Sequence, residues 1–385
     1  MFALVATLAI QALVSMAVLT PAVFAAVAAP EIGVSAHDIG VYTSVIYAAA
    51  CVASAASGGP IRRHGAIRLS QYCLVACGAG LALTATANLA LVLLGALLIG
   101  VGYGPITPAS SHLLIRQTPP QRRSLVFSLK QTGVPIGGVL AGIAVPAFVL
   151  ALGWRGAALT SGALCLLMAA LAEPLHRSLD DDADPKAQGE RGILTAIRLV
   201  LTNPGLRRLA LASLAFAAIQ LCFSAFVVTF LAERVGLALV VAGAIMAAAQ
   251  AAGIAARILW GWVADRFVPA RALLMALGLA MGAAGIATGF ITAAWPLSAI
   301  IAVTMLLGAS ALGWNGVYLA EVAQLAPAGA VGAATGGALS LTFLGIVIGP
   351  PVFGAVVTAS GSYRPAFFAA AVAAAAAALI LRRAR

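Results

Sequence analysis

Twelve apolar runs, each long enough to cross a bilayer as a helix, dominate this sequence. A transmembrane helix needs about 17 to 25 mostly apolar residues. The runs cover approximately residues 3–29, 40–58, 69–87, 89–112, 124–150, 156–172, 208–232, 236–263, 271–291, 296–320, 332–357 and 363–381. The pattern therefore predicts an all-α integral membrane protein with twelve transmembrane helices.

The composition excludes a soluble globular protein. Hydrophobic residues make up 63% of the chain and charged residues only 9%, whereas soluble domains are near half apolar and a quarter charged. The first run lacks a basic region before it and is too long for a signal peptide, so we interpret it as the first helix. The five cysteines lie inside apolar runs, without metal-ligand spacing, so we expect free core thiols and no metal or cofactor.

The basic residues predict the topology. Cytoplasmic loops of membrane proteins are enriched in lysine and arginine. Of the 22 basic residues, 17 fall at the even-numbered loops and the C-terminus, whereas the odd-numbered loops hold only Arg155, Arg234 and Arg364. We therefore expect both termini to be cytoplasmic, in a bacterial-type inner membrane.

One long loop divides the chain into two halves. The predicted domains are a six-helix bundle over residues 1–172, a linker over 173–207 and a second six-helix bundle over 208–385. The run DDDADPKAQGE in the linker predicts a solvated segment. The run GILTAIRLVLTNPG that follows has apolar residues at helical spacing and predicts a helix along the membrane surface.

The two halves share residues at one fixed offset. Gln11 and Ser15 recur 209 positions later as Gln220 and Ser224. The same offset relates Gly104 to Gly313, Arg155 to Arg364 and Ala157 to Ala366. Single matches carry little weight in an alanine-rich chain, but several at one offset predict a parallel repeat of six helices, an arrangement found among secondary transporters.

Several short motifs resemble those of the major facilitator superfamily. GWVADRF at 261–267 is similar to the G-x-x-x-D-R signature of its loop between helices 8 and 9. GIVIGPPVFG at 345–354 resembles its glycine- and proline-rich interface helices, and GWR at 153–155 is also similar. The first copy of the loop motif, GGPIRRHG at 58–65, departs from the pattern by placing Arg62 where the acid stands. The contact of this loop with helix 11, which would hold the cytoplasmic side shut in one state, is therefore expected to be weak or built differently.

Charged residues near the predicted cytoplasmic helix ends are candidates for a gate. Asp265 is expected to accept hydrogen bonds from N–H groups that start the fifth helix, or to pair with Arg122 or Arg123. Glu321 is expected to pair with Arg266 or Arg271. The alternative is that these are ordinary interfacial ion pairs of small energy.

Two cations lie inside predicted helices. Lys130 is seven residues beyond Arg123, about 10 Å along the helix, and Arg257 is eight residues before Asp265, about 12 Å. A charge near the bilayer centre costs roughly 2.5 to 3.5 kcal/mol, and no acidic residue lies at that depth in the sequence. We therefore expect an anionic substrate to supply the balancing charge. Alternatively, Lys130 reaches the interface or helix-end carbonyls, and Arg257 reaches Glu321.

The sequence around Arg257, ARILWGWVAD, resembles helix 8 of the monocarboxylate transporters and of the oxalate/formate antiporters. The resemblance implies that Arg257 contacts a substrate carboxylate. The acidic and aromatic motif that monocarboxylate transporters carry on helix 1 is absent here. Helix 11 lacks the basic residue of the oxalate exchangers, and Lys130 is a candidate to replace it.

Neutral polar residues complete the predicted substrate site, each equally open to a helix-packing role. They are Gln250, Gln11, Gln220, Tyr103, Asn315 and Tyr318. Gln131 neighbours Lys130 but is expected to point about 100° away from it on a continuous helix. His112 is a candidate for proton coupling, because its imidazole titrates near neutral pH.

These features predict a secondary active transporter of a small organic anion, expected to be a carboxylate, by alternating access between two halves. It would work by anion exchange or by proton-coupled symport. The alternative is an exporter of amphipathic drugs or other hydrophobic compounds. The four scattered histidines and the absence of nucleophile motifs argue against an enzyme. We expect a monomer in the bilayer that binds a small molecule and no nucleic acid.

Overall fold

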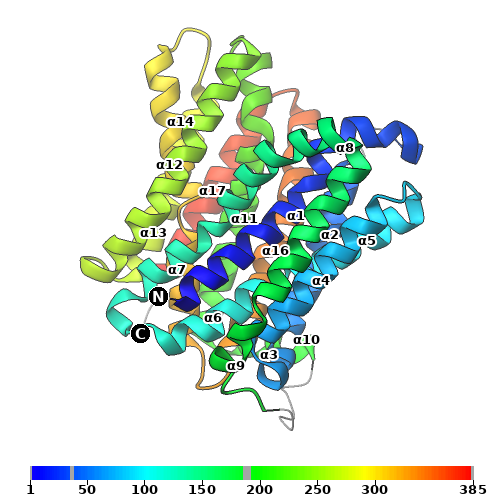
Figure 1. Ribbon diagram of the computed structural model, residues 1–385. Helices are drawn as coiled ribbons and strands as arrows, with labels where there is room; N and C mark the ends of the chain where they lie inside the picture. The colour runs from blue at the N-terminus through cyan, green and yellow to red at the C-terminus, as the bar shows by residue number, and fades with distance from the viewer. Residues whose placement is uncertain (1, 35–38, 185–191, 383–385) are drawn as a thin grey trace. The chain divides into compact units, whose positions relative to one another are not determined.

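The computed structural model describes residues 2–34, 39–184 and 192–382, and helices account for nearly all of them (Figure 1). Among the described residues there is no β-strand. The helices are α1 (Phe2–Ile32), α2 (Ile39–Ala56), α3 (Gly58–His64), α4 (Ala66–Thr84), α5 (Leu89–Tyr103), α6 (Ile106–Gln117), η2 (Pro120–Arg122), α7 (Arg123–Gln131), α8 (Gly133–Leu171), α9 (Glu173–Leu179), α10 (Ile193–Thr202), α11 (Pro204–Glu233), α12 (Leu239–Arg266), α13 (Ala270–Phe290), α14 (Leu297–Ala311), α15 (Asn315–Leu325), α16 (Val331–Ser360) and α17 (Tyr363–Arg382).

The apolar helices account for the predicted crossings of a membrane. Ten are long and apolar enough to span it, and the bent pair Gly40–Ala56 and Gly58–His64 adds an eleventh. The helical run Pro120–Leu171 has 52 residues, about twice the length that one crossing needs. Gly153 interrupts this run with a φ of 71°, and the chain reverses direction there (Figure 1). The run therefore crosses twice, which completes the twelve helices of the predicted fold.

Three predicted helices are broken rather than continuous. Helix 4 divides into α5 and α6 around Gly104, helix 5 into α7 and α8 at Thr132, and helix 10 into α14 and α15 around Gly313. Prolines explain two of the breaks, because a proline has no N–H to donate to the carbonyl four residues earlier. Pro108 leaves the Gly104 carbonyl without that bond, and Pro135 does the same to Gln131. The spans predicted at 89–112, 124–150 and 296–320 lie within the candidate spans Leu89–Gln117, Pro120–Leu171 and Leu297–Leu325, and the breaks inside them were not predicted.

The repeat of the two halves appears in local contacts. Trp154, where helices 5 and 6 meet, packs on Phe24 with ring centroids 5.6 Å apart and donates from Nε1 to Glu31 at 3.0 Å. Tyr363 lies 209 residues later, packs on Phe230 at 5.6 Å, and donates from its hydroxyl to Glu233 at 3.4 Å. The same junction is thus built twice, which agrees with the expected repeat.

The contacts divide the chain into two compact units. Unit 1 contains residues 1–118, 129–202 and 326–340, and unit 2 contains 119–128, 203–325 and 341–385. Each sequence half therefore gives one short segment to the unit built mainly from the other half. Units 1 and 2 are described separately below, and the domain boundaries at 172 and 208 stay a prediction.

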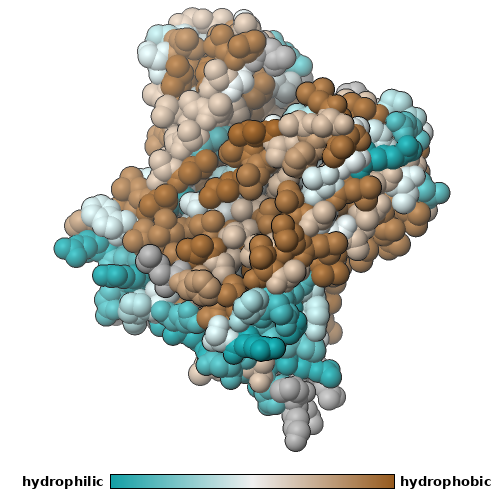
Figure 2. Space-filling model, in the orientation of Figure 1, coloured by the Kyte–Doolittle hydropathy of each residue, from teal (hydrophilic) through white to brown (hydrophobic). Residues whose placement is uncertain are grey.

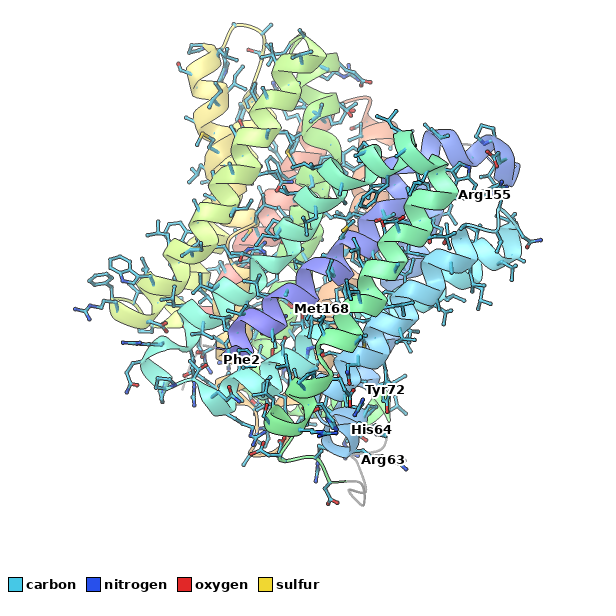
Figure 3. The ribbon with its side chains drawn as sticks, viewed as in Figure 1. Phe2, Arg63, His64, Tyr72, Arg155 and Met168 are labelled. Atoms are coloured by element: carbon cyan, nitrogen blue, oxygen red, sulfur yellow. The ribbon has the colours of Figure 1, made fainter. Side chains whose placement is uncertain are left out.

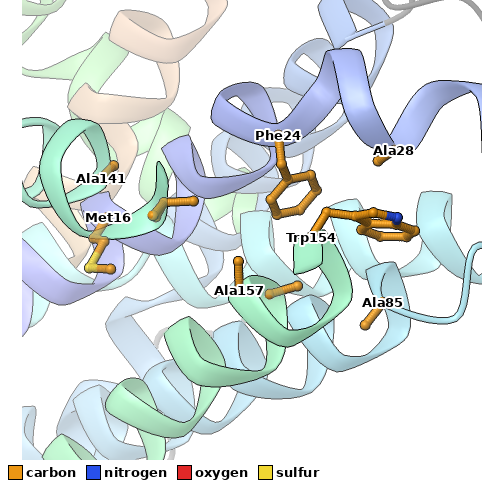
Figure 4. Packing of buried hydrophobic residues seen from close by; sticks show 9 residues of the cluster. Met16, Phe24, Ala28, Ala85, Ala141, Trp154 and Ala157 are labelled. Carbon is orange, nitrogen blue, oxygen red and sulfur yellow. The ribbon is translucent and has the colours of Figure 1, made fainter. Parts of the chain in front are cut away.

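Small residues allow the helices of unit 1 to pack closely. In the core cluster of Figure 4, Trp154 and Phe24 are surrounded by the methyl groups of alanines such as Ala28 and Ala157. A β-carbon on Gly137 of α8 would lie 2.3 Å from the Ala12 carbonyl oxygen of α1. Only glycine tolerates this approach, so the small residues of α8 serve helix packing.

The hydropathy of the surface of unit 1 changes along its length. Hydrophilic residues gather around α9 and α3, whereas the surface of α8 is largely hydrophobic (Figure 2). Arg63, His64 and Tyr72 lie together at the hydrophilic end, and Arg155 lies at the opposite end (Figure 3). An apolar band between polar ends is the surface that a bilayer requires.

Candidate functional site

The ammonium group of Lys130 is buried at the end of α7, where the side chain is 1% exposed. Its Nζ donates to Gln11 Oε1 at 2.8 Å, to Gln131 Oε1 at 3.0 Å and to Thr107 Oγ1 at 3.1 Å. An ammonium group has three hydrogens, so all three are bonded, each to a neutral oxygen. Lys130 therefore neither reaches the interface nor bonds helix-end carbonyls.

Two helix breaks bring the Lys130 acceptors together. Thr107 lies in the first turn of α6, directly after the break of helix 4. Gln131 is the last residue of α7, next to the break before α8, and its amide oxygen accepts from Lys130. Gln131 was expected to point about 100° away from the lysine, but both side chains are long and flexible and their ends meet in this hydrogen bond.

Gln11 is the centre of this polar cluster. Its Oε1 accepts from Lys130 and from Thr107 Oγ1 at 3.1 Å, and its Nε2 donates to Ser15 Oγ at 3.2 Å. A β-carbon on Gly133 would lie 2.9 Å from the Gln11 Cβ, so the glycine lets α8 approach α1 here. Gln11 is 1% exposed. The buried amide is therefore held in one orientation, with its oxygen toward the ammonium.

The charge of Lys130 is not neutralised within the protein. None of the ion pairs between described side chains includes Lys130. Its three neutral acceptors satisfy the hydrogen bonds of the side chain, but none of them carries a negative charge that would balance an ammonium group in a low-dielectric interior.

Arg257 occupies a different setting in unit 2. Its Nε and Nη2 donate to the Leu312 carbonyl oxygen at 3.0 and 2.7 Å, and the residue is 5% exposed. Leu312 follows the last residue of α14, where the helix 10 break leaves carbonyls without helical partners. Arg257 therefore stabilises the end of α14, and the alternative of a bond to Glu321 is wrong because Glu321 pairs with Arg271 at 2.7 Å.

Gln220 is the counterpart of Gln11 at the helix 10 break. Its Oε1 accepts from Trp314 Nε1 and Asn315 Nδ2, both at 3.2 Å. Ser224 Oγ donates to the Gln220 carbonyl at 3.0 Å. The equivalent glutamines of helices 1 and 7 thus each bind residues that follow a helix break, and within unit 2 the hydrogen bonds to the Gln220 amide oxygen come from neutral donors.

The other predicted substrate residues lie within the membrane-spanning helices. Tyr318 is 2% exposed, with its ring 5.2 Å from that of Trp314. Tyr103 is half-buried, and its ring meets Tyr47 edge-on at 6.0 Å. Gln250 is half-buried on α12, two turns before Arg257. Their roles as substrate contacts stay predictions.

His112 lies at the linker end of α6. Its Nε2 is 2.6 Å from Asp182 Oδ2, and Arg116 one turn later binds Asp181 at 2.8 Å and Asp182 at 2.6 Å. Thr107 at the start of the same short helix contacts Lys130. The helix α6 thus connects the lysine cluster to the acidic linker, and the proton-coupling role of His112 stays a prediction.

The composition of the linker predicted a solvated segment, but part of the linker is buried. The side chain of Asp180 is 0% exposed, accepts from the N–H groups of Ile67 and Arg68 at 2.8 Å each, and contacts His176 at 2.8 Å. A carboxylate at the first turn of a helix is favourable because it satisfies unbonded N–H groups. Sequence reasoning missed this role because three adjacent aspartates resemble a solvated run. Lys186 and Arg191 lie outside the described residues.

Asp265 makes the expected contact with the start of the fifth helix. Its two carboxylate oxygens accept from the N–H groups of Ser124 and Leu125 at 2.9 and 2.8 Å. Both residues belong to the segment 119–128 that packs in unit 2. Arg122 and Arg266 are exposed. Asp265 therefore binds the helix terminus itself, and the gating role stays a prediction.

Small residues, rather than an acid, hold α16 against α2 in unit 1. Ser340 Oγ donates to the Cys51 carbonyl at 2.8 Å, and Cys51 Sγ donates to the Ser340 carbonyl at 3.3 Å. Ser54 Oγ donates to the Gly336 carbonyl at 3.2 Å. A β-carbon on Gly58 would lie 2.7 Å from that of Ala333. Reciprocal hydrogen bonds and close backbone contact therefore join α16 to α2 and α3, and a latch at this position stays a prediction.

The comparisons with known proteins agree with this architecture. The Major Facilitator Superfamily model matches residues 5–350, and a search of curated proteins found no match. The fold is similar to that of the human organic anion transporter MFSD10 (TETRAN), with a TM-score of 0.76 at 17% identity over 98% of both chains. The E. coli fucose:proton symporter FucP gives 0.76 at 17% identity over 99% of this chain and 98% of that chain. The proton:xylose symporter XylE gives 0.70 at 16% identity over 98% and 94%.

Identities this low establish the fold alone. The resemblance to the monocarboxylate and oxalate/formate branches around Arg257 stays a prediction. The family model, in contrast, covers most of the sequence, and the twelve crossings and the duplicated helix junctions fit it. The chain is therefore a multi-pass membrane transporter rather than an enzyme, and it belongs to the major facilitator superfamily.

Proposed function

We propose that this transporter carries a small organic anion, and that the anion is a carboxylate. The observation that carries the proposal is the buried ammonium of Lys130, whose three hydrogen bonds all go to neutral oxygens. A carboxylate that replaces one of these oxygens would convert an ammonium hydrogen bond to a neutral acceptor into an ion pair, in which both partners carry charge. The site would therefore favour an anion over a neutral solute of the same size.

Gln11 and Thr107 would select the anion further. When a carboxylate takes the place of Gln11 Oε1 at the ammonium, the hydroxyl of Thr107 and the amide N–H groups of Gln11 remain as neutral donors for its oxygens. These groups lie on α1 and α6, so binding would change contacts on both sides of the helix 4 break. Arg257 would contribute a second substrate contact, in which case the anion competes with the Leu312 carbonyl for its donors.

We propose alternating access as the mechanism. Asp265 on the fifth-helix terminus and the Cys51–Ser340 contact on α16 would close the cytoplasmic side in one state and separate in the other. Each contact joins segments from different halves of the sequence, which is what a gate requires. In this proposal the arginine-rich loops and both termini lie on the same side as these contacts, in the cytoplasm of a bacterial-type cell.

The coupling mode would be either exchange of one anion for another or symport with a proton. In symport the proton would travel on the substrate or on His112. The contact of His112 with Asp182 favours a linker role for this histidine over direct substrate contact. Among the structural neighbours, MFSD10 is described as an organic anion transporter and the others as sugar symporters, so the neighbours support transport without selecting the substrate.

A ligand screen on the purified protein tests the proposal. Short mono- and dicarboxylates, neutral sugars and amphipathic cations are added separately, and the melting temperature is recorded. We expect at least one carboxylate to raise the melting temperature, because a ligand that binds only the folded state stabilises it. Stabilisation by amphipathic cations alone would contradict the proposal and favour a drug exporter.

A further inference from the structure

A pocket on the surface of unit 1 lies between α2, α4 and α5, beside the bend that leads into α3. Its volume is about 530 Å³, and α3 is turned by 59° from α2. The lining residues include Val52 of α2, Pro60 of α3, Tyr72 and Ala76 of α4, and Leu97 of α5. The walls are therefore mostly apolar, and neither the proposed substrate site nor the proposed gate uses them.

The pocket is open to the hydrocarbon of the bilayer. The helix α4 is long and apolar enough to span a membrane, and α5 with α6 forms a second candidate span, Leu89–Gln117. Val52, Leu97 and Val101, which all line the pocket, are roughly half-exposed. Apolar side chains that are exposed on membrane-spanning helices face acyl chains, because the bilayer core holds no water. A lipid tail can therefore enter the pocket from the bilayer.

One end of the pocket has a polar rim. Residues three and four apart lie on the same face of a helix, so Arg63 and His64 share the face on which Pro60 lines the pocket. The His64 ring meets the ring of Tyr72, another lining residue, edge-on at 5.8 Å. Figure 3 shows Arg63, His64 and Tyr72 together at the hydrophilic end of unit 1. The rim therefore lies at headgroup depth, where tyrosines are enriched.

The rim is basic. None of the ion pairs between described side chains includes Arg63, which is exposed. Glu173 and Asp180, which contact α4 nearby, are bonded to Arg68 and to backbone N–H groups. The loop motif of the family would place an acid in this segment, but residues 58–65 hold none. The departure from the motif therefore leaves a cation beside an apolar pocket.

We propose that this pocket binds an anionic phospholipid of the surrounding bilayer. One acyl chain would lie between α2, α4 and α5, and the phosphate would lie at Arg63, because a guanidinium group can bind a phosphate through two parallel hydrogen bonds. The imidazole of His64 and the hydroxyl of Tyr72 are further donors at the same rim. Basic pockets between transmembrane helices are suited to anionic headgroups, and here the apolar walls add a requirement for the lipid tail.

Native mass spectrometry of the purified full chain tests this site. Dioleoyl-phosphatidylglycerol and dioleoyl-phosphatidylcholine, which share their tails and phosphate but differ in net charge, are titrated separately, and the apparent Kd of each is measured. We expect phosphatidylglycerol to bind at least roughly fivefold more tightly, which corresponds to about 1 kcal/mol for one arginine near an anionic headgroup. Arg63→Ala should lose this preference, and Arg63→Lys should retain most of it.

A neighbouring arginine separates a site from net charge. Arg62 is also exposed on α3, but it is two residues from Pro60, about 200° around the helix, and so lies on the face away from the pocket. Arg62→Ala removes the same charge and should leave the preference for phosphatidylglycerol unchanged. Equal loss of preference in Arg62→Ala and Arg63→Ala, or no preference in the unmodified chain, would overturn the proposal.

The contribution of the tail is tested by filling the pocket. Ala76→Phe places a ring among the lining residues, whereas Ala79→Phe places the same ring about one turn later on α4, at an exposed position outside the pocket. We expect Ala76→Phe to weaken phosphatidylglycerol binding about tenfold, because it removes apolar contacts of the tail, and Ala79→Phe to change it by less than about twofold. Equal weakening by the two rings would contradict a tail in this pocket.

A lipid is distinguished from a free anion with glycerol 3-phosphate, which carries the charge without a tail. We expect it not to compete with phosphatidylglycerol at millimolar concentration. Competition by glycerol 3-phosphate together with full binding by Ala76→Phe would identify a free-phosphate site and contradict a lipid site.

Discussion

The amide oxygen of Gln11 lies 2.8 Å from the ammonium nitrogen of Lys130, and both side chains are only 1% exposed. A glutamine at this distance satisfies a hydrogen bond without adding charge. Gln220, at the equivalent position of the second half, instead accepts from the neutral donors of Trp314 and Asn315. The repeat thus places similar amides at two helix breaks, where Gln11 accepts from Lys130 and Gln220 accepts from neutral donors.

Gln11→Glu should abolish high-affinity anion binding. The substitution keeps the shape of the side chain but gives Lys130 a carboxylate partner inside the protein. A substrate anion would then meet a neutral ion pair, and its affinity should fall by roughly 30-fold or more, the loss expected when a buried charge is no longer available. The measurement is the Kd of the stabilising carboxylate, determined by titration of the melting temperature.

Gln220→Glu is the matched control, because it makes the same change beside neutral donors. It should bind the carboxylate within a few-fold of the unmodified protein. Equal losses in the two variants would show that Lys130 is not the recognition group.

Ser340→Cys should allow a reversible block of transport. The Ser340 and Cys51 side chains each contact the other residue's backbone, at 2.8 and 3.3 Å, so a second thiol at 340 would face the native one. Oxidation should join α2 to α16 and hold the proposed cytoplasmic gate closed. Uptake into proteoliposomes should fall to background after oxidation and return after reduction.

The control for this block is Ser340→Cys combined with Cys51→Ser, which cannot form the bond. Its uptake should not respond to oxidant. Full uptake by the oxidised single variant, with the disulfide demonstrated by mass spectrometry, would contradict a gate at this contact.

Asp265→Asn and Asp180→Asn should differ in their consequences. Each carboxylate accepts two N–H groups at a helix start, Asp265 at α7 and Asp180 at α4, and loss of such a cap costs about 0.5 to 2 kcal/mol. Asp265 joins segments from different sequence halves, so Asp265→Asn should raise the alkylation rate of a cysteine placed at Ser128. Asp180 joins segments of one half, so Asp180→Asn should lower the melting temperature and leave that rate unchanged. The same increase in both variants would remove Asp265 from the gate.

The ion pair between Arg68 and Glu173 should resist acid. Hydrogen bonds from Arg68 and then Gln71 lower the pKa of Glu173 to about 2. A lowered carboxyl pKa contributes stability above the usual pKa near 4, and that contribution disappears as the pH falls toward 2. Arg68→Gln should therefore lower the melting temperature at pH 7 and by a similar, small amount at pH 5. A difference between the two proteins that disappears by pH 5 would contradict the assigned pKa.

The sequence predicted the membrane-spanning helices well because the length of an apolar run is a local signal. The twelve runs, the repeat and the contact of Asp265 with the fifth helix all follow from residue type and spacing. The helix breaks were missed, although Pro108 and Pro135 mark two of them, because prolines also occur in continuous transmembrane helices. Thr107 and Gln131, two of the acceptors of Lys130, lie next to these breaks.

The candidate site was predicted only in part, because the helix breaks near it were not predicted. Lys130 and Gln11 were identified because a buried charge and a buried amide are conspicuous in an apolar chain. Arg257 was identified too, but its contact with Leu312 depends on a carbonyl that the helix 10 break leaves unbonded. The buried position of Asp180 depends on tertiary contacts between the linker and α4, which no local pattern in the sequence predicts.

The most direct test of anion recognition is carboxylate uptake by Lys130→Gln in proteoliposomes, at matched protein content. Glutamine keeps a polar side chain that can bond Gln11 and Thr107 but removes the charge. We predict that saturable uptake is lost while the melting temperature without ligand stays the same or rises, because an uncompensated buried charge has been removed. Uptake by Lys130→Gln with unchanged affinity and rate would contradict the assignment of Lys130 as the group that binds the transported anion.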